Sequence, residues 1–325
     1  MTDTWTTRKQ LTVPKYGSVR HFCELMAFAA TLEEPKLKFT ITEKEVYEIE
    51  DVEKWREWRK TKTMPSASMI ASLLGVGYRS FNMEFKEMVG ISKRAEQSGF
   101  SKRMMDHGTN FEPATRQAYC DFYKSETFKL LESGTKSRIM SICDGNNEWD
   151  CLVTPDMLVS NDSHPDVIGK RIVELKCPAY GIVTVKRPIN DVVKNFTELY
   201  PQGRANHFLQ AAMYAIIFQV ERFDLFYFFT DGTTEWFFNV RFIVTEPLKK
   251  LIYESIQSCW RHIEKYQQEK KHDYPIIKDK KVHIQRIQNI MKESHWDDII
   301  KCVTSDELVQ KEIDVLEEDS SDESE

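Results

Sequence analysis

The sequence predicts an α/β (α+β) core, in which a central mixed β-sheet is flanked by helices. The first observation is the order of the segments: a helical stretch, a group of strand-like runs, a second helix, a β-hairpin and a last helix. The second is ANHFLQAAMYAIIF at 205–218, which is apolar nearly all round and is therefore typical of a buried helix. The third is a pair of aromatic runs joined around Asp231 and Gly232, which is a good hairpin signal.

The composition indicates a folded protein kept inside the cell. Hydrophobic residues make up 41% of the 325, enough for a sizeable core, and 30% of the residues are charged. The N-terminus has no apolar signal segment, and no window approaches the run of about 18 apolar residues that a membrane-spanning helix needs. The seven cysteines form no CxxC pair, which argues against a disulfide framework and against a zinc or iron–sulfur centre. We therefore expect an intracellular protein with reduced thiols and no membrane partner.

Charge is distributed unevenly along the chain. The net charge is −6, but the segment 306–325 alone carries −9, so the rest of the chain is mildly basic at +3. Such a body is compatible with a nucleic-acid partner. We expect an N-terminal extension (1–50), a main domain (51–270), a basic, helical C-terminal segment (271–305) and a disordered acidic tail (306–325).

Helical signals dominate before the strands. We expect helices over 19–32 and 51–60, and a short apolar helix that begins near Ser66 or Ser68. The segment TITEKEVYEIE, at 40–50, fits a strand or a helix equally well.

A basic, loop-like stretch, 86–103, leads to a helix in HGTNFEPATRQAYCDFYK. Its expected cap is Thr109 or Asn110, and Pro113 is tolerated in a first helical turn. Glu112 then lies near the helix start, where negative charge is favourable, so an ordinary exposed glutamate is one interpretation of it.

Three strand-like runs follow, at 138–143, 151–159 and 171–176, separated by loops rich in Asp, Asn, Gly, Ser and Pro. A long amphipathic helix is expected from residue 246 to about residue 269. Beyond it, EKKHDYPIIKDKKVHIQR is expected to be a solvated linker, with contact to a DNA backbone or nuclear import as alternatives.

Three charged residues, Asp156, Glu174 and Lys176, interrupt these otherwise apolar strands. Strand interiors exclude such residues unless they are paired, metal-bound or functional. Glu174 and Lys176 are two apart and so share one face of their strand, and Asp156 approaches the same edge if the two strands pair. Close carboxylates are unfavourable without a cation, and Mg²⁺, completed by the Leu175 carbonyl and waters, suits them. A solvated salt bridge on a hairpin is the alternative.

The residues around this cluster resemble a nuclease signature. TPD at 154–156 and VELK at 173–176 are similar to the PD-(D/E)xK pattern. The helix HFLQAAMY, in which Gln210 precedes Tyr214 by four residues, resembles the QxxxY motif of RecB-like nucleases.

The order of the motifs resembles one family within that group, the lambda-exonuclease-like YqaJ viral recombinases. The motifs are W-x3-R at 55–59, SAS at 66–68, the Glu112 helix, PD, ELKCP and the glutamine helix. The resemblance extends over about 51–242 and implies a restriction-endonuclease-like core.

The resemblance also implies roles for the charged cluster. Asp156 and Glu174 would hold metal together with the Leu175 carbonyl, and Glu112 would supply a further carboxylate near the metal pair. Lys176 would position the attacking water, and we therefore expect it to matter for rate rather than for stability.

Roles for the flanking motifs are implied in the same way. Gln210 would contact the water or the substrate phosphate, and Tyr214 would support it, with plain core packing as the alternative. Arg59, Ser66 and Ser68 would hold a terminal 5′-phosphate, which suits a bidentate guanidinium and hydroxyls at a helix start.

The resemblance to this family implies a Mg²⁺-dependent exonuclease that digests one strand of double-stranded DNA from a 5′ end. It also implies two bound metal ions, with Mn²⁺ as the alternative to Mg²⁺. Its partners would be double-stranded DNA ends, a single-strand-annealing or single-strand-binding protein and, in a homo-oligomer, further copies of the chain. It would act in the nucleus or at a viral replication site. Endonuclease or RNase action by the same site, and a catalytically silent nucleic-acid-binding protein, are the alternatives.

Overall fold

The structure is a computed structural model. Its described residues are 39–93, 98–124, 127–145, 147–161, 169–179, 182, 186–271 and 280–304. The helix expected at 19–32 and the acidic tail at 306–325 lie outside them. None of the helices in these ranges combines the length and the apolar character that a bilayer crossing requires.

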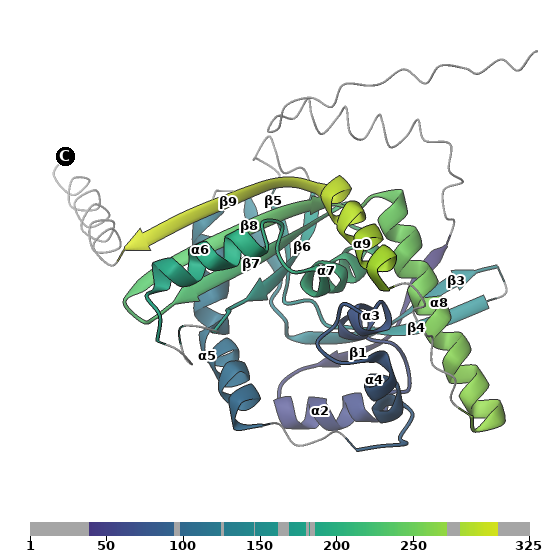
Figure 1. Ribbon diagram of the computed structural model, residues 1–325. Helices are drawn as coiled ribbons and strands as arrows, with labels where there is room; N and C mark the ends of the chain where they lie inside the picture. The colour runs from purple at the N-terminus through teal and green to yellow at the C-terminus, as the bar shows by residue number, and fades with distance from the viewer. Residues whose placement is uncertain are drawn as a thin grey trace, which may run out of the picture.

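Two β-sheets form the centre of the molecule (Figure 1). In the six-stranded sheet only β6 and β7 pair in parallel, so the sheet is mixed, as the sequence predicted. Its strands, in spatial order, are β2 (Phe128–Glu132), β5 (Met157–Asn161), β6 (Lys170–Lys176), β7 (Arg222–Thr230), β8 (Thr234–Ile243) and β9 (His295–Thr304). The three-stranded sheet is antiparallel and consists of β1 (Thr40–Glu48), β3 (Lys136–Asp144) and β4 (Asn147–Val153).

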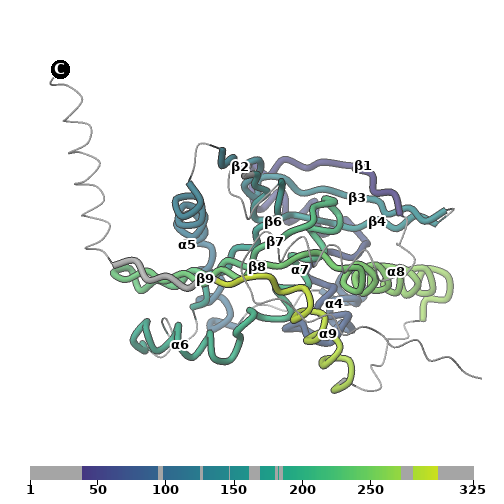
Figure 2. The backbone as a smooth tube through the Cα atoms, turned by 90° about the horizontal axis from the view of Figure 1, so that it is seen from above, coloured from purple at the N-terminus to yellow at the C-terminus, as the bar shows by residue number. Residues whose placement is uncertain are grey.

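Helices cover both faces of the larger sheet. Figure 2 shows α5 on one side of it and α6 on the other, with α7 buried between the sheet and the remaining helices. The bounds are α2 (Val52–Lys60), α3 (Ala67–Leu73), α4 (Phe81–Met88), α5 (Gly99–Phe122), α6 (Ile189–Leu199), α7 (Ala205–Ile217), α8 (Glu246–Glu269) and α9 (Lys280–Ser294). The apolar helix, the aromatic hairpin and the long amphipathic helix are therefore present where the sequence predicted them.

The alternation of side chains along β6 divides the core in two. Val173 and Leu175 pack in a cluster with α5, whereas Ile172 packs in the larger cluster that contains α7. Because side chains in a strand alternate between faces, Glu174 points to the same face as Ile172, toward α7. The buried charge that the sequence singled out thus lies on the α7 side of the sheet.

Helix α5 begins ten residues before the predicted cap. Its N-cap is Ser98, whose Oγ accepts a hydrogen bond from the Ser101 amide at 3.2 Å. Pro113 consequently lies inside the helix rather than in its first turn, and Glu112 lies in the middle of α5. The prediction failed because proline normally marks a helix start, and here the tertiary contacts of the helix override the hydrogen bond that proline removes.

The predicted strand at 151–159 is two strands. Pro155 has no amide hydrogen to donate, and the chain crosses there from the three-stranded to the six-stranded sheet. The interruption leaves Asp156 just before β5, at the point where the two sheets meet.

Both ends of the described chain contribute strands. Residues of the expected N-terminal extension form β1, which pairs with β3 from Thr40 to Glu48. From Lys280 the expected linker is helical, because α9 begins there, and its side chains at 281–286 are exposed or half-buried. Beyond the linker, α9 buries Ile287 and Ile290 against the core. The strand β9 then adds to the edge of the larger sheet beside β8.

A buried polar cluster fastens α5 to the sheet. Asp224 on β7 is 2% exposed and its Oδ2 accepts hydrogen bonds from the Tyr119 hydroxyl at 2.8 Å and from Asn239 Nδ2 at 3.2 Å. The same oxygen lies 3.4 Å from Arg171 Nη1, and the Arg171 guanidinium also packs over the Tyr123 ring at 4.5 Å from its centroid. Asp224 is therefore the counter-ion of a buried arginine whose nitrogens have no hydrogen-bond acceptor.

Replacing Asp224 by asparagine should lower the free energy of unfolding by about 3–5 kcal/mol, because it leaves the Arg171 charge buried and uncompensated. Urea unfolding measures this loss. Asp297→Asn is the matched control, since Asp297 pairs with Arg241 at 3.5 Å but is 40% exposed, and it should cost less than about 1 kcal/mol. Equal losses in the two variants would contradict the assignment, and adding Arg171→Met to Asp224→Asn should recover much of the loss.

Candidate active site

The strand β6 ends in the two charges that the sequence placed on one face. Glu174 is fully buried, whereas the Lys176 side chain is 25% exposed. Lys176 Nζ contacts Glu174 Oε1 directly. The ammonium therefore lies at the border between the buried carboxylate and the solvent.

Asp156 joins this pair because β5 and β6 are antiparallel neighbours. The register pairs Met157 with Val173, which brings the residue before β5 to the end of β6. Asp156 Oδ2 accepts a hydrogen bond from the Leu175 amide at 2.8 Å and lies 3.8 Å from Lys176 Nζ. The pairing that the sequence required for a joint site is present.

The electrostatics of the cluster are dominated by burial. Burial and the nearby charge of Asp156 hold the pKa of Glu174 well above its usual range, and Lys176 only partly opposes them. Burial would lower the pKa of Lys176, but the charges of Glu174 and Asp156 raise it instead. The site thus holds one buried and one partly exposed carboxylate with a single ammonium beside them, which favours the binding of a cation.

The donor atoms fit a magnesium ion. Glu174 Oε2 is buried and has no hydrogen-bond partner in the protein, so one carboxylate oxygen is left for a ligand. Two carboxylates with a backbone carbonyl, here that of Leu175, and water are what Mg²⁺ commonly takes in proteins. In the described part of the chain no three His, Cys, Asp or Glu side chains lie close enough together to form a complete cage for a metal.

Glu112 approaches the cluster from α5. Burial and, next, the charge of Asp156 raise the pKa of Glu112, while Arg116 and Lys176 oppose the shift. Its Oε1 accepts a hydrogen bond from Arg116 Nη2 at 2.7 Å. The side chain is therefore within electrostatic range of the site, and its role as a metal ligand stays a prediction.

Gln210 and Tyr214 lie on the helix that covers Glu174. They are four residues apart on α7, and Gln210 Nε2 donates a hydrogen bond to the Tyr214 hydroxyl at 3.3 Å. Burial, followed by the negative charge of Glu174 and Asp156, raises the pKa of Tyr214. Tyr214 also belongs to the main hydrophobic core, so it both packs and borders the carboxylates.

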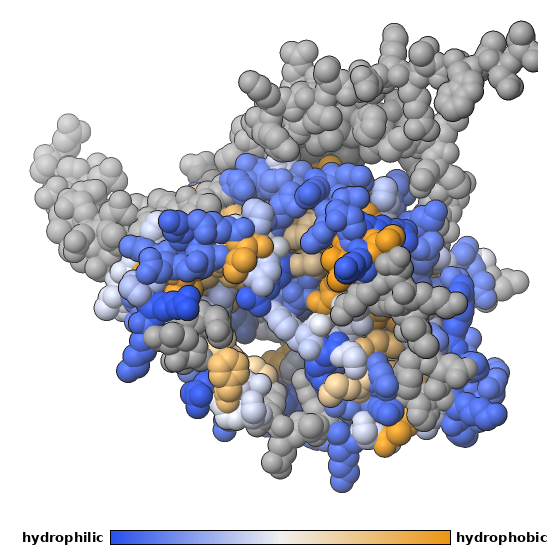
Figure 3. Space-filling model, in the orientation of Figure 1, coloured by the Kyte–Doolittle hydropathy of each residue, from blue (hydrophilic) through white to orange (hydrophobic). Residues whose placement is uncertain are grey.

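The predicted phosphate-binding residues form a second group beside the first. Arg59 Nη2 donates to Ser66 Oγ at 3.4 Å, and the hydroxyls of Ser66 and Ser68 are 3.2 Å apart. The positive charge of Arg59 slightly opposes the rise that burial causes in the pKa of Tyr214, so Arg59 is within electrostatic range of that tyrosine. The face drawn in Figure 3 is hollowed between α5, which carries Glu112, and the helices α3 and α4.

The two tryptophans beside this group have partners of their own. The Trp58 ring stacks on Tyr47 with centroids 4.7 Å apart, and Lys62 Nζ lies 4.7 Å from its centroid. Arg59 lies 5.6 Å from the Trp55 centroid. Of the two α2 tryptophans, Trp55 therefore packs against Arg59 and Trp58 packs against β1 of the three-stranded sheet.

Sequence reasoning missed a residue on α7 that faces the site. His207 lies one turn before Gln210, and burial together with the charges of Lys176 and Arg204 holds its pKa well below the usual range. Its spacing from Gln210 and Tyr214 was the available signal, because residues three and seven apart share a helix face.

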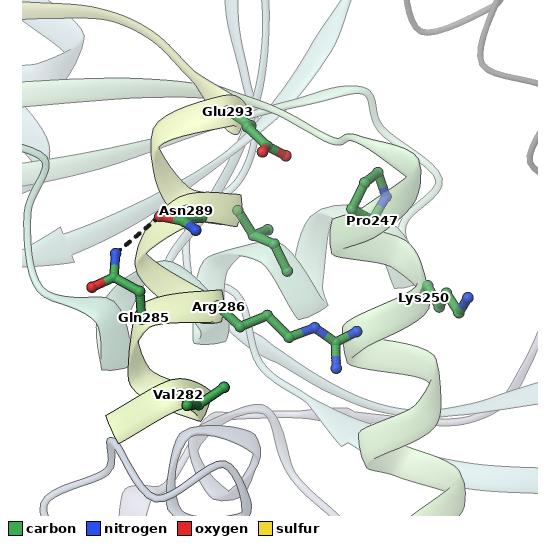
Figure 4. A pocket seen from close by; sticks show the side chains of 8 residues that line it. Pro247, Lys250, Val282, Gln285, Arg286, Asn289 and Glu293 are labelled. Carbon is green, nitrogen blue, oxygen red and sulfur yellow. Dashed lines mark hydrogen bonds between the residues drawn. The ribbon is translucent and has the colours of Figure 1, made fainter. Parts of the chain in front are cut away.

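The pocket drawn in Figure 4 lies elsewhere, between α8 and α9. Its lining includes Lys250, Arg286 and Glu293, and none of the predicted site residues contributes to it. The candidate site is thus defined by its charges rather than by that pocket.

Comparison with known proteins identifies one domain. Residues 54–199 match the family model described as the YqaJ-like viral recombinase domain. The match includes Arg59 with Ser66 and Ser68, and the charges of β6, whereas Gln210 and Tyr214 lie beyond it. The family match supports a nuclease of the lambda-exonuclease type.

Two solved structures of the alkaline exonuclease LHK-Exo from Laribacter hongkongensis are similar to the chain. The complex with dAMP is 16% identical, with a TM-score of 0.46, and the match covers 67% of this chain and 97% of that one. The other structure has the same identity and coverage and a TM-score of 0.45. No curated protein matches the chain.

If the β5–β6 cluster holds magnesium, Mg²⁺ should raise the melting temperature of the wild-type protein by about 5–10 °C at a concentration near 100 times Kd, because a metal held there would bind only the folded chain. Glu174→Gln and Asp156→Asn should lose this shift, and in EDTA Glu174→Gln should melt no lower than wild type, since it removes a buried charge. Differential scanning calorimetry with and without Mg²⁺ measures both effects.

The matched control for this experiment is Glu57→Gln, which alters an exposed carboxylate paired with Lys60 on α2. It should keep the whole magnesium shift. If all four proteins respond equally to Mg²⁺, the metal binds somewhere other than the β5–β6 cluster.

Proposed function

We propose that the protein is a Mg²⁺-dependent exonuclease that degrades one strand of double-stranded DNA in the 5′ to 3′ direction. The observation that carries this proposal is the convergence of Asp156, Glu174 and Lys176 at one strand end, with one buried Glu174 oxygen left without a partner. The YqaJ-like domain supports the same reaction class.

In this proposal the metal-holding residues are Asp156, Glu174 and the Leu175 carbonyl, with Glu112 as a further carboxylate. A bound metal pair, Mg²⁺ or in its place Mn²⁺, would activate water and neutralise charge on the phosphate. The reaction adds water to phosphorus and breaks the bond to the 3′-oxygen, which leaves with a proton. Lys176 Nζ, held between the two carboxylates, would orient the attacking water, and Gln210 would contact that water or the phosphate.

The end preference rests on the second group of residues. Arg59 and the hydroxyls of Ser66 and Ser68 are already joined by hydrogen bonds, which suits a pocket for a dianionic terminal phosphate. Ser66 precedes the first turn of α3, although that helix is short, and its hydroxyl makes no cap hydrogen bond of its own. The hydroxyl groups are therefore oriented by Arg59 rather than by the helix.

Such an enzyme would supply single strands for DNA recombination or processing. Its partners would then be double-stranded DNA ends, a single-strand-annealing or single-strand-binding protein and, if it assembles, further copies of itself. The same role would place it in the nucleus or at a viral replication site.

Lys176→Ala should reduce digestion of end-labelled duplex DNA by about 10²–10⁴-fold, because the ammonium orients the reacting water. Time courses in Mg²⁺ and in EDTA measure the rate. Lys170→Ala is the matched control, since Lys170 is exposed at the other end of the same strand, and it should leave the rate unchanged. Equal rates for wild type and Lys176→Ala would show that the assigned mechanism is wrong.

Arg59→Ala should abolish the preference for a 5′-phosphorylated duplex over an unphosphorylated one. The reason is that Arg59 would supply the charged hydrogen bonds that recognise the phosphate. The ratio of kcat/KM for the two substrates measures the preference. Arg56→Ala, which changes an exposed arginine on the same helix, should keep it. A circular duplex cleaved as fast as a linear one would instead identify an endonuclease, and faster cleavage of RNA an RNase.

A further inference from the structure

Tyr78 is the most exposed of the large hydrophobic and aromatic side chains in the described part of the chain, at 73%. It belongs to the turn that joins α3 to α4. That turn is pressed tightly against the end of α3, since a Cβ added at Gly77 would meet Ser72 Oγ at 2.4 Å. The ring is therefore presented to solvent from a firmly packed turn rather than from a loose loop.

The Tyr78 hydroxyl is anchored although the ring is exposed. It accepts a hydrogen bond from Arg204 Nη1 at 2.9 Å and lies 3.1 Å from His207 Nε2. The guanidinium of Arg204 is itself held over the Tyr200 ring, at 4.7 Å from the centroid. Two side chains from the start of α7 thus fix the direction in which the Tyr78 ring points.

The anchor continues into the protein through Tyr227, which is fully buried. The Tyr227 hydroxyl accepts from the Arg204 amide at 2.9 Å and lies 3.1 Å from His207 Nδ1. Gly203 permits this approach, because it has φ +74° and an added Cβ would meet the same hydroxyl at 2.7 Å. The backbone at the start of α7 is thus shaped around the tyrosine.

The proton positions in this network follow from its acceptors. The Tyr227 hydroxyl has two hydrogen-bond partners, the Arg204 amide and His207 Nδ1. Because the amide is a donor, only His207 Nδ1 can accept the hydrogen bond that the hydroxyl donates. Burial lowers the pKa of His207 and keeps the ring neutral, so its single ring proton is on Nε2. That N–H donates a hydrogen bond to the Tyr78 hydroxyl oxygen. The Tyr78 oxygen therefore accepts twice, and its own proton is directed outward as a donor.

The network adjoins the candidate active site. Tyr227 is the register partner of Lys176 on the neighbouring strand, and His207 lies one turn before Gln210 on α7. An exposed aromatic ring is thus fixed beside the residues proposed to cleave DNA.

We propose that Tyr78 is a substrate-binding residue whose ring stacks on an unpaired nucleobase of the strand that enters the site. The proposal rests on the proposed nuclease function. Every nucleobase has an aromatic face, so such a contact holds a strand without reading its sequence. Anchoring by Arg204 and His207 lowers the loss of side-chain freedom on binding, which strengthens a single stacking contact.

The test separates the base from the backbone. A duplex with a short single-stranded end is compared with the same duplex carrying abasic sugars in that end, by fluorescence anisotropy in EDTA, where metal-dependent cleavage is absent. Tyr78→Ala should weaken binding of the normal end about 5- to 100-fold, and should leave binding of the abasic end within about 2-fold of wild type. Tyr78→Phe, which keeps the ring but releases the anchor, should show a smaller loss.

Val282→Ala is the control, because it truncates another exposed side chain, 65% exposed, on α9. It should bind both ends like wild type. The proposal is overturned if Tyr78→Ala binds the normal end like wild type, if it loses equally on both ends, or if the wild type binds neither. Failure of the nuclease function would appear separately, as a wild type that binds DNA but does not digest it in Mg²⁺.

Discussion

The burial of Glu174 is the constraint around which the site is arranged. A carboxylate in the interior of a six-stranded sheet costs several kcal/mol unless its charge is compensated. Here the compensation within the protein is a single contact from Lys176, while Asp156 adds negative charge nearby. Such an arrangement lowers the stability of the folded chain and is retained where it serves a reaction. The neighbouring strands β5 and β7 and the helix α7 hold the carboxylate in place against that cost.

A second buried charge, that of Asp224 on β7, holds α5 against the sheet near Glu174. Asp224 ties Tyr119 of α5 to the strand beside Glu174, and Tyr119 lies two helical turns from Glu112. On the opposite face Tyr227, from the same strand, fixes the start of α7 and so the position of Gln210. Neighbouring residues of β7 alternate between faces, so one strand positions helices on both sides of the sheet. The distances in the site therefore depend on residues that take no part in the chemistry.

The sequence was sufficient where a local pattern carried the information. Two-residue spacing placed Glu174 and Lys176 on one face, and an apolar helix could pack only in the core, which identified α7. The segment that forms β1 was left open between strand and helix, the strand β9 was not predicted, and α5 was shortened because Pro113 resembles the proline of a helix start. The contact between Tyr78 and His207 joins residues 129 positions apart, so no local pattern could reveal it. Folding the two segments together was necessary to see that contact.

The three groups of residues around the candidate site suit a substrate whose sequence is not read. In the proposed function, Arg59 with its two serines would offer charge and hydrogen bonds to a phosphate, and the β5–β6 cluster would act on the backbone of the strand. Neither group has a geometry that distinguishes one base from another, since phosphates are the same at every step. Stacking on Tyr78 would add affinity through the face that all bases share. A nuclease that advances along DNA must bind each new nucleotide as well as the last, and contacts limited to phosphates and aromatic faces meet that requirement.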